Sequence, residues 1–486
     1  MNLTKNKCFA FIGILVGGLF YFSAFGQSSS LSLPNSKEKI KIEDLTKVPA
    51  DKNFHIELKM REHEYLAEPP NSDQPNQIYS FSGRMNYYQR TYSQWVFVSD
   101  IKVISAERES EKPYLNIPDF YTGYDNQTSL IQFYLGRKRE EWSAFDDLWK
   151  LGVWQPIARW DYIHPETLGL TGAFLNVGNE WMRVKLFGTP FFLPDQGPNF
   201  ELKDGRFSSN NRWFWTPQNQ TTILSQPSHL YYDLDRPSEQ DVIMHDGFAG
   251  ALEVGHPHSG GWGRFSYSRK PRNQLHLGIE GKLQISKDNR TQVTVHPIVV
   301  YHNVATVEAG YKTEDLSFWG SVTNDRPEES GQPEDWVQSE LREINIFSGM
   351  LQHSLRWIGL RNSHIRYSYM QIDKRKNLAP STLLGDTVDS SLDRFMFDKV
   401  FSTEYMQQFF ISNHYSLRYG IKYLYSIPDE AGLFSTKIEY LVGENFIFDL
   451  GLDVLGANES ADKAGSGLMT RYRSNDRVAV GMTYVF

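Results

Sequence analysis

The sequence predicts an all-β chain that closes into an antiparallel transmembrane barrel of about 18 strands, within a range of roughly 16 to 20. Three observations lead to this prediction. Apolar and polar residues alternate along most of the chain, short connectors alternate with long ones, and the last strand ends on the aromatic residue Phe486.

The N-terminus has the composition of a secretory signal. Lys5 and Lys7 precede an apolar run over 8–22, and Ala24 and Gly26 place small residues at the two positions that a signal peptidase requires. The sequence therefore predicts a signal peptide over 1–26, with an uncleaved anchor as the alternative. The polar stretch 27–52 is predicted to be a flexible periplasmic leader, and the barrel is predicted over 53–486.

Composition excludes several classes of protein. Mean hydropathy is −0.48, which argues against a bundle of membrane-spanning helices. The one cysteine, Cys8, lies within the signal, so the exported chain has no disulfide and no cysteine metal site. Loss of Lys5 and Lys7 would change the formal charge from −8 to −10, which argues against nucleic acid as a partner. We expect no cofactor and no metal.

Strict alternation is the main evidence for strands with two different faces. It is clear in segments 53–61, 274–285, 415–425 and 446–454, where one face is apolar and the other is polar and often charged. A soluble β-sandwich also alternates, but its polar face is less often charged. Strands of about 9–11 residues suit a tilted bilayer crossing. In lipid every backbone group must be paired within the protein, so such strands have to close into a barrel.

Connector lengths predict how the barrel is oriented. Short turns are expected at 443–445, 412–414, 361–363, 312–315 and 287–289, and long connectors at 455–476, 374–397 and 324–342. Bacterial barrels have short periplasmic turns and both chain ends in the periplasm. The short turns are therefore predicted to face the periplasm. The region over 77–245 leaves the number of strands open.

Two stretches in that region do not alternate. Residues 139–167 contain four tryptophans and could form a short amphipathic helix, with Phe145, Leu148, Trp149 and Leu151 on one side. Residues 189–245 form a connector too long to be without structure or function. We expect either stretch to fold into the lumen, and 189–245 is the segment expected to narrow a pore.

The last strand resembles the C-terminal signature of Gram-negative outer-membrane proteins. Its apolar face comprises Val478, Val480, Met482, Tyr484 and Phe486. The resemblance implies a location in the outer membrane of a Gram-negative bacterium, contact with its lipids and lipopolysaccharide, and recognition of this strand by the barrel-assembly machinery. When a strand of the machinery pairs with it by β-augmentation, the exposed edge of this strand cannot pair with other chains before the barrel closes.

A second, shorter stretch resembles alginate-export-type and related porin barrels. It is Leu135-Gly136-Arg137-Lys138-Arg139, followed by Trp142 and Asp147. The resemblance implies a solute channel.

The polar faces of the predicted strands supply candidate lumen-lining residues. These are Lys59, Arg61, Glu280, Lys282, Arg356, Arg366, Arg418, Lys422, Asp449 and Asp453. Among them Arg356, Arg366, Arg418 and Lys422 would form a basic ladder that guides anionic solutes. The alternative is that they only solvate the inner wall of a wide barrel.

Other chemistry has less support. Trp213, Phe214 and Trp215 lie among amide side chains and could stack on sugar rings, although a loop core would have the same composition. His353 and Ser354 are adjacent, as are Ser363 and His364, but neighbouring strand residues point to opposite faces. We therefore do not expect an enzyme. The sequence favours a porin-like channel for small polar or ionic solutes; the alternative is a non-conducting surface barrel that binds polysaccharide or another envelope partner.

Overall fold

The computed structural model describes residues 51–486 except 70, 72–73, 110–111, 126–129, 180, 224–225, 257–258, 285–289, 329–336, 339–342, 375–393, 413 and 457–467. The predicted signal peptide and nearly all of the predicted leader lie outside the described residues. The first strand starts at Asp51, two residues before the predicted start of the barrel at Asn53.

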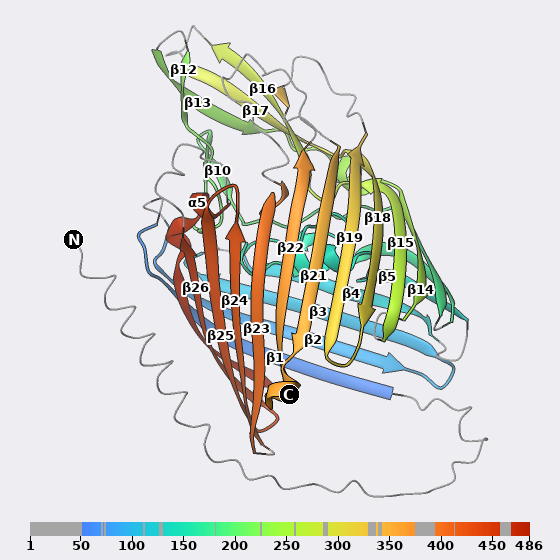
Figure 1. The fold of residues 1–486 in the computed structure, drawn as a ribbon. Helices are drawn as coiled ribbons and strands as arrows, with labels where there is room; N and C mark the ends of the chain where they lie inside the picture. Colours follow the sequence, from blue (N-terminus) through green and yellow to red (C-terminus); the bar gives the residue numbers. More distant parts are fainter. Residues whose placement is uncertain are drawn as a thin grey trace, which may run out of the picture. The chain divides into compact units, whose positions relative to one another are not determined.

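Eighteen antiparallel strands form a closed barrel, as predicted (Figure 1). Each strand pairs with the next one in the barrel, and the last strand pairs with the first, so no edge remains unpaired. The barrel strands are β1 (Asp51–Tyr65), β2 (Gln77–Arg90), β3 (Trp95–Glu107), β4 (Tyr114–Asp125), β5 (Ile131–Lys138), β8 (Leu170–Gly178), β9 (Met182–Thr189), β14 (Gly247–Gly255), β15 (Gly260–Pro271), β18 (Tyr301–Lys312), β19 (Leu316–Pro327), β21 (Ile344–Ser354), β22 (Ser363–Lys374), β23 (Lys399–Ser412), β24 (Tyr415–Ser426), β25 (Ala431–Val442), β26 (Phe446–Gly456) and β27 (Arg477–Val485).

Alternation along the strands gives the barrel an apolar outer face. Met60 of β1 is paired with Met482 of β27, and the two are 59% and 37% exposed. Large apolar side chains are exposed in the same way around the barrel, for example Phe265, Phe318 and Phe448. A soluble protein does not expose so much apolar surface, whereas a barrel in lipid requires it.

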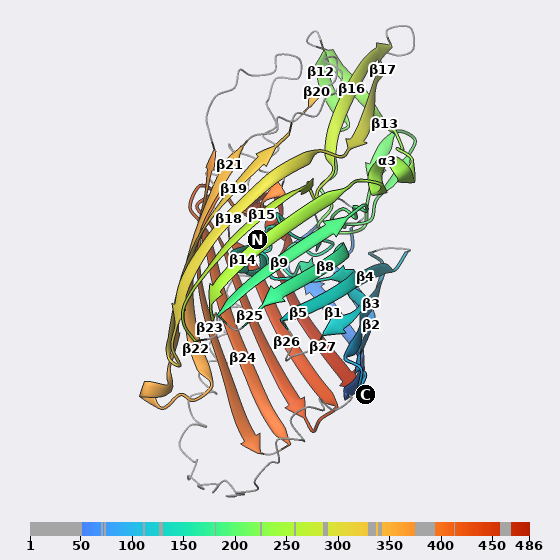
Figure 2. The same cartoon turned by 90° about the vertical axis from the view of Figure 1, so that its right-hand side faces the viewer.

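The two ends of the barrel differ in their connections. At the end that carries Asp51 and Phe486, here called the terminal end, strands are joined by short segments such as 91–94, 313–315 and 443–445. The opposite end, here called the loop end, carries the long connections (Figure 2). Having the start of the first strand and the end of the last strand beside the short turns is the arrangement that the connector lengths predicted.

A five-stranded sheet stands beyond the loop end and corrects one prediction (Figures 1 and 2). It contains β12 (Gln220–Ile223), β13 (Gln226–Leu234), β16 (His276–Gln284), β17 (Arg290–Ile298) and β20 (Val337–Gln338). Segment 274–285 was therefore wrong as a barrel strand. The turn expected at 287–289 lies outside the described residues, and its flanking strands belong to the loop-end connection between β15 and β18. Alternation identifies a strand with two unlike faces but does not tell which sheet it joins.

The remaining elements are short and lie in connections. They are α2 (Ala144–Trp149), β6 (Ile157–Ala158), β7 (Glu166–Thr167), β10 (Glu201–Lys203), β11 (Arg206–Ser208), α3 (Glu239–Ile243), η3 (Arg356–Ile358), α5 (Leu468–Arg471) and η5 (Arg473–Asn475). Among the described residues, no helix is long and apolar enough to cross a membrane.

Candidate functional site

Residues 139–167, here called the insert, connect β5 to β8 and bind to the inner wall of the barrel. Helix α2 in the insert is the short amphipathic helix that the sequence predicted, and its N-cap is Ser143. Glu308 on the inner face of β18 accepts hydrogen bonds from the Ser143 Oγ (2.6 Å) and the Ala144 N (3.1 Å). A carboxylate at the start of a helix satisfies backbone N–H groups that have no partner within the helix. Glu308 therefore fixes the start of α2 to the wall.

Ion pairs attach the rest of the insert to other strands. They join Arg139 to Asp119 of β4 (2.6 Å), Glu166 to Lys102 of β3 (3.2 Å), Glu140 to Lys185 of β9 (2.9 Å), Glu141 to Arg264 of β15 (3.2 Å) and Asp161 to Arg477 of β27 (2.8 Å). A hydrogen bond joins the His164 Nε2 to the Asp453 carboxylate of β26 (3.2 Å).

Charged neighbours keep the insert's buried carboxylates ionised. Burial alone would raise the pKa of Glu140, but Lys138 and Lys185 lower it to about 2. Burial likewise opposes ionisation of Asp161, yet the positive charge of Arg477 holds the pKa of Asp161 below its usual value. At neutral pH both groups are therefore charged and hold the insert against the wall.

The insert also forms an apolar core inside the loop-end half of the barrel. Trp142, Phe145, Trp149 and Trp154 are each at most 6% exposed, and the rings of Trp142 and Trp154 stack with centroids 5.9 Å apart. They belong to one buried cluster with inward-facing strand residues that include Val304, Ile346, Met350, Met370 and Val400. Burial of each such side chain stabilises the packed state by about 1.5–3 kcal/mol. The insert thus occupies part of the loop-end half of the lumen.

The long connector 189–245 packs at the loop end and also contributes to the outer sheet. Its Arg212 is 1% exposed and lies over the Tyr65 ring, with the guanidinium carbon 4.2 Å from the ring centroid. That guanidinium binds the β1–β2 connection and the segment before β27. Trp213 belongs to the same buried apolar cluster as the insert, and strands β12 and β13 take another part of this connector into the outer five-stranded sheet. Narrowing of a pore by 189–245 stays a prediction.

The terminal-end half of the lumen has a charged and partly solvated wall. Arg366 of β22 is paired in register with Glu404 of β23, and Glu404 with Lys422 of β24. The Arg366 Nη1 lies 3.3 Å from the Glu404 carboxylate. The side chains of Arg418 and Lys437 are 50% and 49% exposed although they face inward, which means that solvent reaches this part of the lumen.

Further round the same wall, β1 and β26 carry a tight ion-pair group. Lys59 and Arg61 contact Asp449 at 2.8 and 2.9 Å. Nearer the loop end, Asp453 accepts a hydrogen bond from the Arg477 Nε (2.9 Å) and from Ser435 (2.6 Å). These four predicted residues lie on β1 and β26, the two strands that pair with β27.

Three predicted lumen residues are not on the barrel wall. Arg356 lies in η3, the turn between β21 and β22 at the terminal end, and its side chain is 58% exposed. Glu280 and Lys282 lie on β16 in the outer five-stranded sheet, where they contact each other at 2.9 Å. The basic ladder of four was therefore wrong at Arg356, because the chain leaves the strand after Ser354.

The proposed sugar-stacking group is split between core and surface. Trp213 is 2% exposed and packs between Tyr162 and Tyr472, so its ring is closed to a ligand. Phe214 stacks on Phe200 with centroids 5.5 Å apart. Trp215 is 51% exposed, with the Arg471 guanidinium 5.1 Å from its ring centroid. Of the three, Trp215 alone presents a ring to solvent.

The last strand lies where its pattern placed it. Val480, Met482 and Phe486 are exposed on the outer face, at 55%, 37% and 58%. The Phe486 N donates to the Ile56 O of β1 (2.9 Å). This bond extends the pairing between β27 and β1 by one residue beyond the end of β27. Recognition of Val478, Tyr484 and this face by the assembly machinery stays a prediction.

Sequence reasoning missed the residues that hold the insert and the connector. Glu308, Lys185, Arg264 and Arg212 are all nearly or fully buried. Alternation would have placed the first three on an inner face, but their partners are up to 165 residues distant in sequence. Among the described residues, no group of His, Cys, Asp or Glu has the arrangement of a metal site.

Several solved structures align with most of this chain. They include Acinetobacter baumannii OccAB3 (TM-score 0.45, 10% identity, 90% of this chain and 99% of that chain) and Pseudomonas aeruginosa OccK9, also called OpdG (TM-score 0.45, 7% identity, 90% and 97%). Pseudomonas aeruginosa OpdQ gives a TM-score of 0.43 at 9% identity over 90% and 98% of the two chains. No protein-family model and no curated protein matches the sequence. These likenesses are distant, and the function proposed below rests on this chain's own side chains.

Proposed function

We propose that the chain is an outer-membrane channel of a Gram-negative bacterium for small polar or ionic solutes, with a lumen narrowed by the insert. The apolar outer face and the closed strand order support a barrel in lipid. The observation that carries the proposal is the solvated, charged wall on β22, β24, β25 and β1.

The polar anchors of the insert lie on one part of the circumference. Its ion pairs and hydrogen bonds reach β2, β3, β4, β9, β15, β18, β26 and β27. In the loop-end half, the insert packs against β21–β23 through apolar side chains, in one cluster with Met350, Met370 and Val400. In the terminal-end half, a solute path is best placed along the charged side chains of β22–β25.

The wall has more cations than carboxylates. Its basic side chains are Lys59, Arg61, Arg366, Arg418, Lys422 and Lys437, and its acidic ones are Glu57, Glu404, Glu439 and Asp449. A positive excess in a narrow lumen raises the local concentration of anions. The proposal therefore includes a preference for anionic over cationic solutes.

Reversal potentials in planar bilayers test this proposal. In water, two unit charges about 4 Å apart interact by ~1 kcal/mol, a factor of roughly five in local ion concentration. Replacing Arg366, Arg418 and Lys422 together by Gln should shift the permeability ratio towards cations by about that factor. Arg356→Gln is the matched control, because Arg356 lies outside the lumen. Unchanged reversal potentials in the triple variant would contradict the proposal.

One observation favours the alternative, a barrel that binds an envelope polysaccharide without conducting. Inward-facing residues near the loop end are almost fully buried on strands all round the barrel, for example Ile78, Val304, Val400 and Ala479. A packed lumen suits a surface binder, and Trp215 would supply its exposed ring. Quenching of tryptophan fluorescence by purified lipopolysaccharide or capsule sugar, lost in Trp215→Ala, together with absence of current, would favour this function.

A further inference from the structure

The connection between β21 and β22 is longer than other connections at the terminal end of the barrel. It spans 355–362, here called the rim turn, and includes η3, whereas the turns at 313–315 and 443–445 are short. Two antiparallel strands can be joined by as few as two residues. Pairing of β21 with β22 therefore does not require a connection of this length.

The rim turn folds back over the outer face of the barrel wall. Ser363 of β22 and Gln407 of β23 are paired in register, an odd number of positions from the ion-paired residues that face the lumen on these strands, so their side chains face outward. Both are nevertheless buried, at 3% and 4% exposed. The Ser363 Oγ donates to the Leu360 O (2.8 Å), and the Gln407 Nε2 donates to the Arg361 O (3.1 Å). The rim turn therefore lies on the lipid-facing side and bonds polar groups that would have no partner in lipid.

Two large apolar side chains of the rim turn are exposed beside this wall. Trp357 is 74% exposed and Ile358 is 50% exposed. The Trp357 ring centroid lies 6.4 Å from that of His353, which shares the outward-facing series of β21 with the exposed Leu351. Figure 2 shows the turn projecting sideways from the wall near the label of β22. The apolar surface of the rim turn is thus continuous with the outer face of the barrel.

Two arginines flank these apolar side chains. Arg356 and Arg361 lie on either side of Trp357 and Ile358 in the sequence, and both arginines are exposed. The Arg356 Nη1 is 3.6 Å from the Glu314 carboxylate, which is too far for a hydrogen bond, and the Glu314 side chain is 89% exposed. An exposed contact of this kind contributes little. The Arg356 guanidinium can therefore bind another anion at the rim turn.

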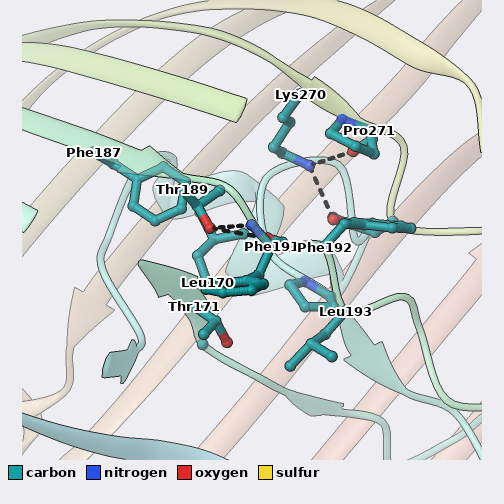
Figure 3. Close-up of a pocket in the computed structure, with 12 residues that line it drawn as sticks. Leu170, Thr171, Phe187, Thr189, Phe191, Phe192, Leu193, Lys270 and Pro271 are labelled. Atoms are coloured by element: carbon teal, nitrogen blue, oxygen red, sulfur yellow. Dashed lines mark hydrogen bonds between the residues drawn. The ribbon is translucent and has the colours of Figure 1, made fainter. Parts of the chain in front are cut away.

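A ligand at the rim turn would bind on an open surface, unlike one in the cavity at the loop end. That cavity is lined by apolar residues such as Leu170 and Phe187, and its cation is Lys270. The Lys270 Nζ already donates to the Asn273 Oδ1 (2.9 Å) and the Pro271 O (3.3 Å) (Figure 3). The rim turn is therefore the better candidate for a bound ligand.

We propose that the rim turn binds glycerophospholipid in the membrane leaflet at the terminal end of the barrel. Trp357 and Ile358 enter the boundary between acyl chains and headgroups, where an indole ring is favourably placed. Arg356 and Arg361 bind the lipid phosphate, whose oxygens match the planar fork of a guanidinium. This site requires the proposed membrane location of the barrel but does not require conduction.

Fluorescence quenching in lipid vesicles locates the Trp357 ring. The native protein and Trp357→Phe are reconstituted in vesicles of phosphatidylglycerol and phosphatidylcholine, with and without acyl chains brominated near the headgroup, and their difference gives the emission of Trp357. We expect loss of most of this emission in brominated lipid and little loss with iodide in the buffer. Trp215, 51% exposed at the loop end, is the matched control: emission isolated with Trp215→Phe should be quenched by iodide and not by brominated lipid. A Trp357 that responds like Trp215 would overturn the site.

Trp95 separates failure of this site from failure of the membrane location. It is 52% exposed at the start of β3, in the outward-facing series of that strand. If brominated lipid quenches Trp95 but not Trp357, the site at the rim turn is overturned and the membrane location stands. If it quenches neither, both are overturned.

Binding of dioleoylphosphatidylglycerol to the full-length protein in detergent, measured by native mass spectrometry, tests the two arginines. Because each arginine near an anionic lipid contributes a factor of roughly five, Arg356→Gln/Arg361→Gln should weaken the tightest binding by that factor or more. The matched control Lys203→Gln/Arg206→Gln removes two exposed cations from β10 and β11 and should leave the affinity unchanged. Dioleoylglycerol, which has no phosphate, should bind all three proteins alike. Equal affinity of the two double variants for phosphatidylglycerol would overturn the phosphate site.

Discussion

Replacement of Arg212 tests what stabilises the loop end of the barrel seam, the pairing between the first strand β1 and the last strand β27. This buried guanidinium donates five hydrogen bonds, to Asn475 Oδ1 (3.1 Å), Asn76 Oδ1 (3.0 Å), Pro75 O (3.3 Å), Ala67 O (3.1 Å) and Ser474 O (2.6 Å). Its partners come from the connection after β1 and the segment before β27. Arg212 therefore joins the two sides of the seam through the connector between β9 and β14.

The expected cost follows from these partners. Arg212→Met keeps an apolar stem but removes all five donors. Each buried polar group left without a partner costs about 1–3 kcal/mol, and carbonyls with a second lone pair cost less. The variant no longer buries a cation among neutral groups, and this offsets part of the lost stability. The net loss of unfolding free energy should be about 2–4 kcal/mol.

Urea unfolding of the protein in lipid vesicles, followed by tryptophan fluorescence, measures that loss. Arg212→Lys should recover less than half of it, because an ammonium cannot reach five acceptors in a planar fork. Arg206→Met, an exposed arginine in the same connector, should change stability by no more than about 0.5 kcal/mol. An Arg212→Met protein as stable as the Arg206→Met control would refute the reasoning.

Two further predictions concern a buried acid and the insert. Burial and the nearby charge of Asp161 raise the pKa of Glu109 to about 8, so between about pH 4.5 and 8 the folded state holds a proton that the unfolded state has lost. Stability should fall as pH rises through that window, and Glu109→Gln should flatten the slope; an unchanged slope in urea titrations would contradict this origin. Glu308→Gln should weaken the attachment of α2 and speed tryptic cleavage of the insert at Lys150 several-fold. Glu314→Gln, a change at an exposed glutamate, should leave the cleavage rate unchanged. Equal cleavage rates in the two variants would exclude Glu308 as the anchor of α2.

Much of the fold could be predicted from the sequence because alternation is a local property. Segments 415–425 and 446–454 became β24 and β26, and the faces of Arg418, Lys422, Asp449 and Asp453 follow directly from a period of two residues. Segment 274–285 alternates equally well yet belongs to the outer sheet, since its partners are set by pairings that local periodicity does not encode.

The interior of the barrel was harder to predict for the same reason. Composition marked 139–167 as unusual, and the helix around Phe145 and Trp149 follows from its apolar spacing. Its contacts with Glu308 and Arg477 depend on closure of the whole barrel, because these partners are brought together from opposite parts of the chain. For Trp213 the sequence left a sugar-stacking ring and a loop core both open, and the packing of Tyr162 and Tyr472 shows that it is core.

Single-channel recording before and after removal of the insert tests the proposed channel most directly. The native protein and a variant with 140–166 replaced by a short Gly-Ser linker would be compared in planar bilayers, after both are shown to be folded by their heat-modifiable migration on gels. We predict stepwise currents from the native protein and markedly larger steps from the variant, because the insert occupies part of the loop-end half of the lumen. Equal conductance, or no current from either folded protein, would contradict a channel narrowed by this segment.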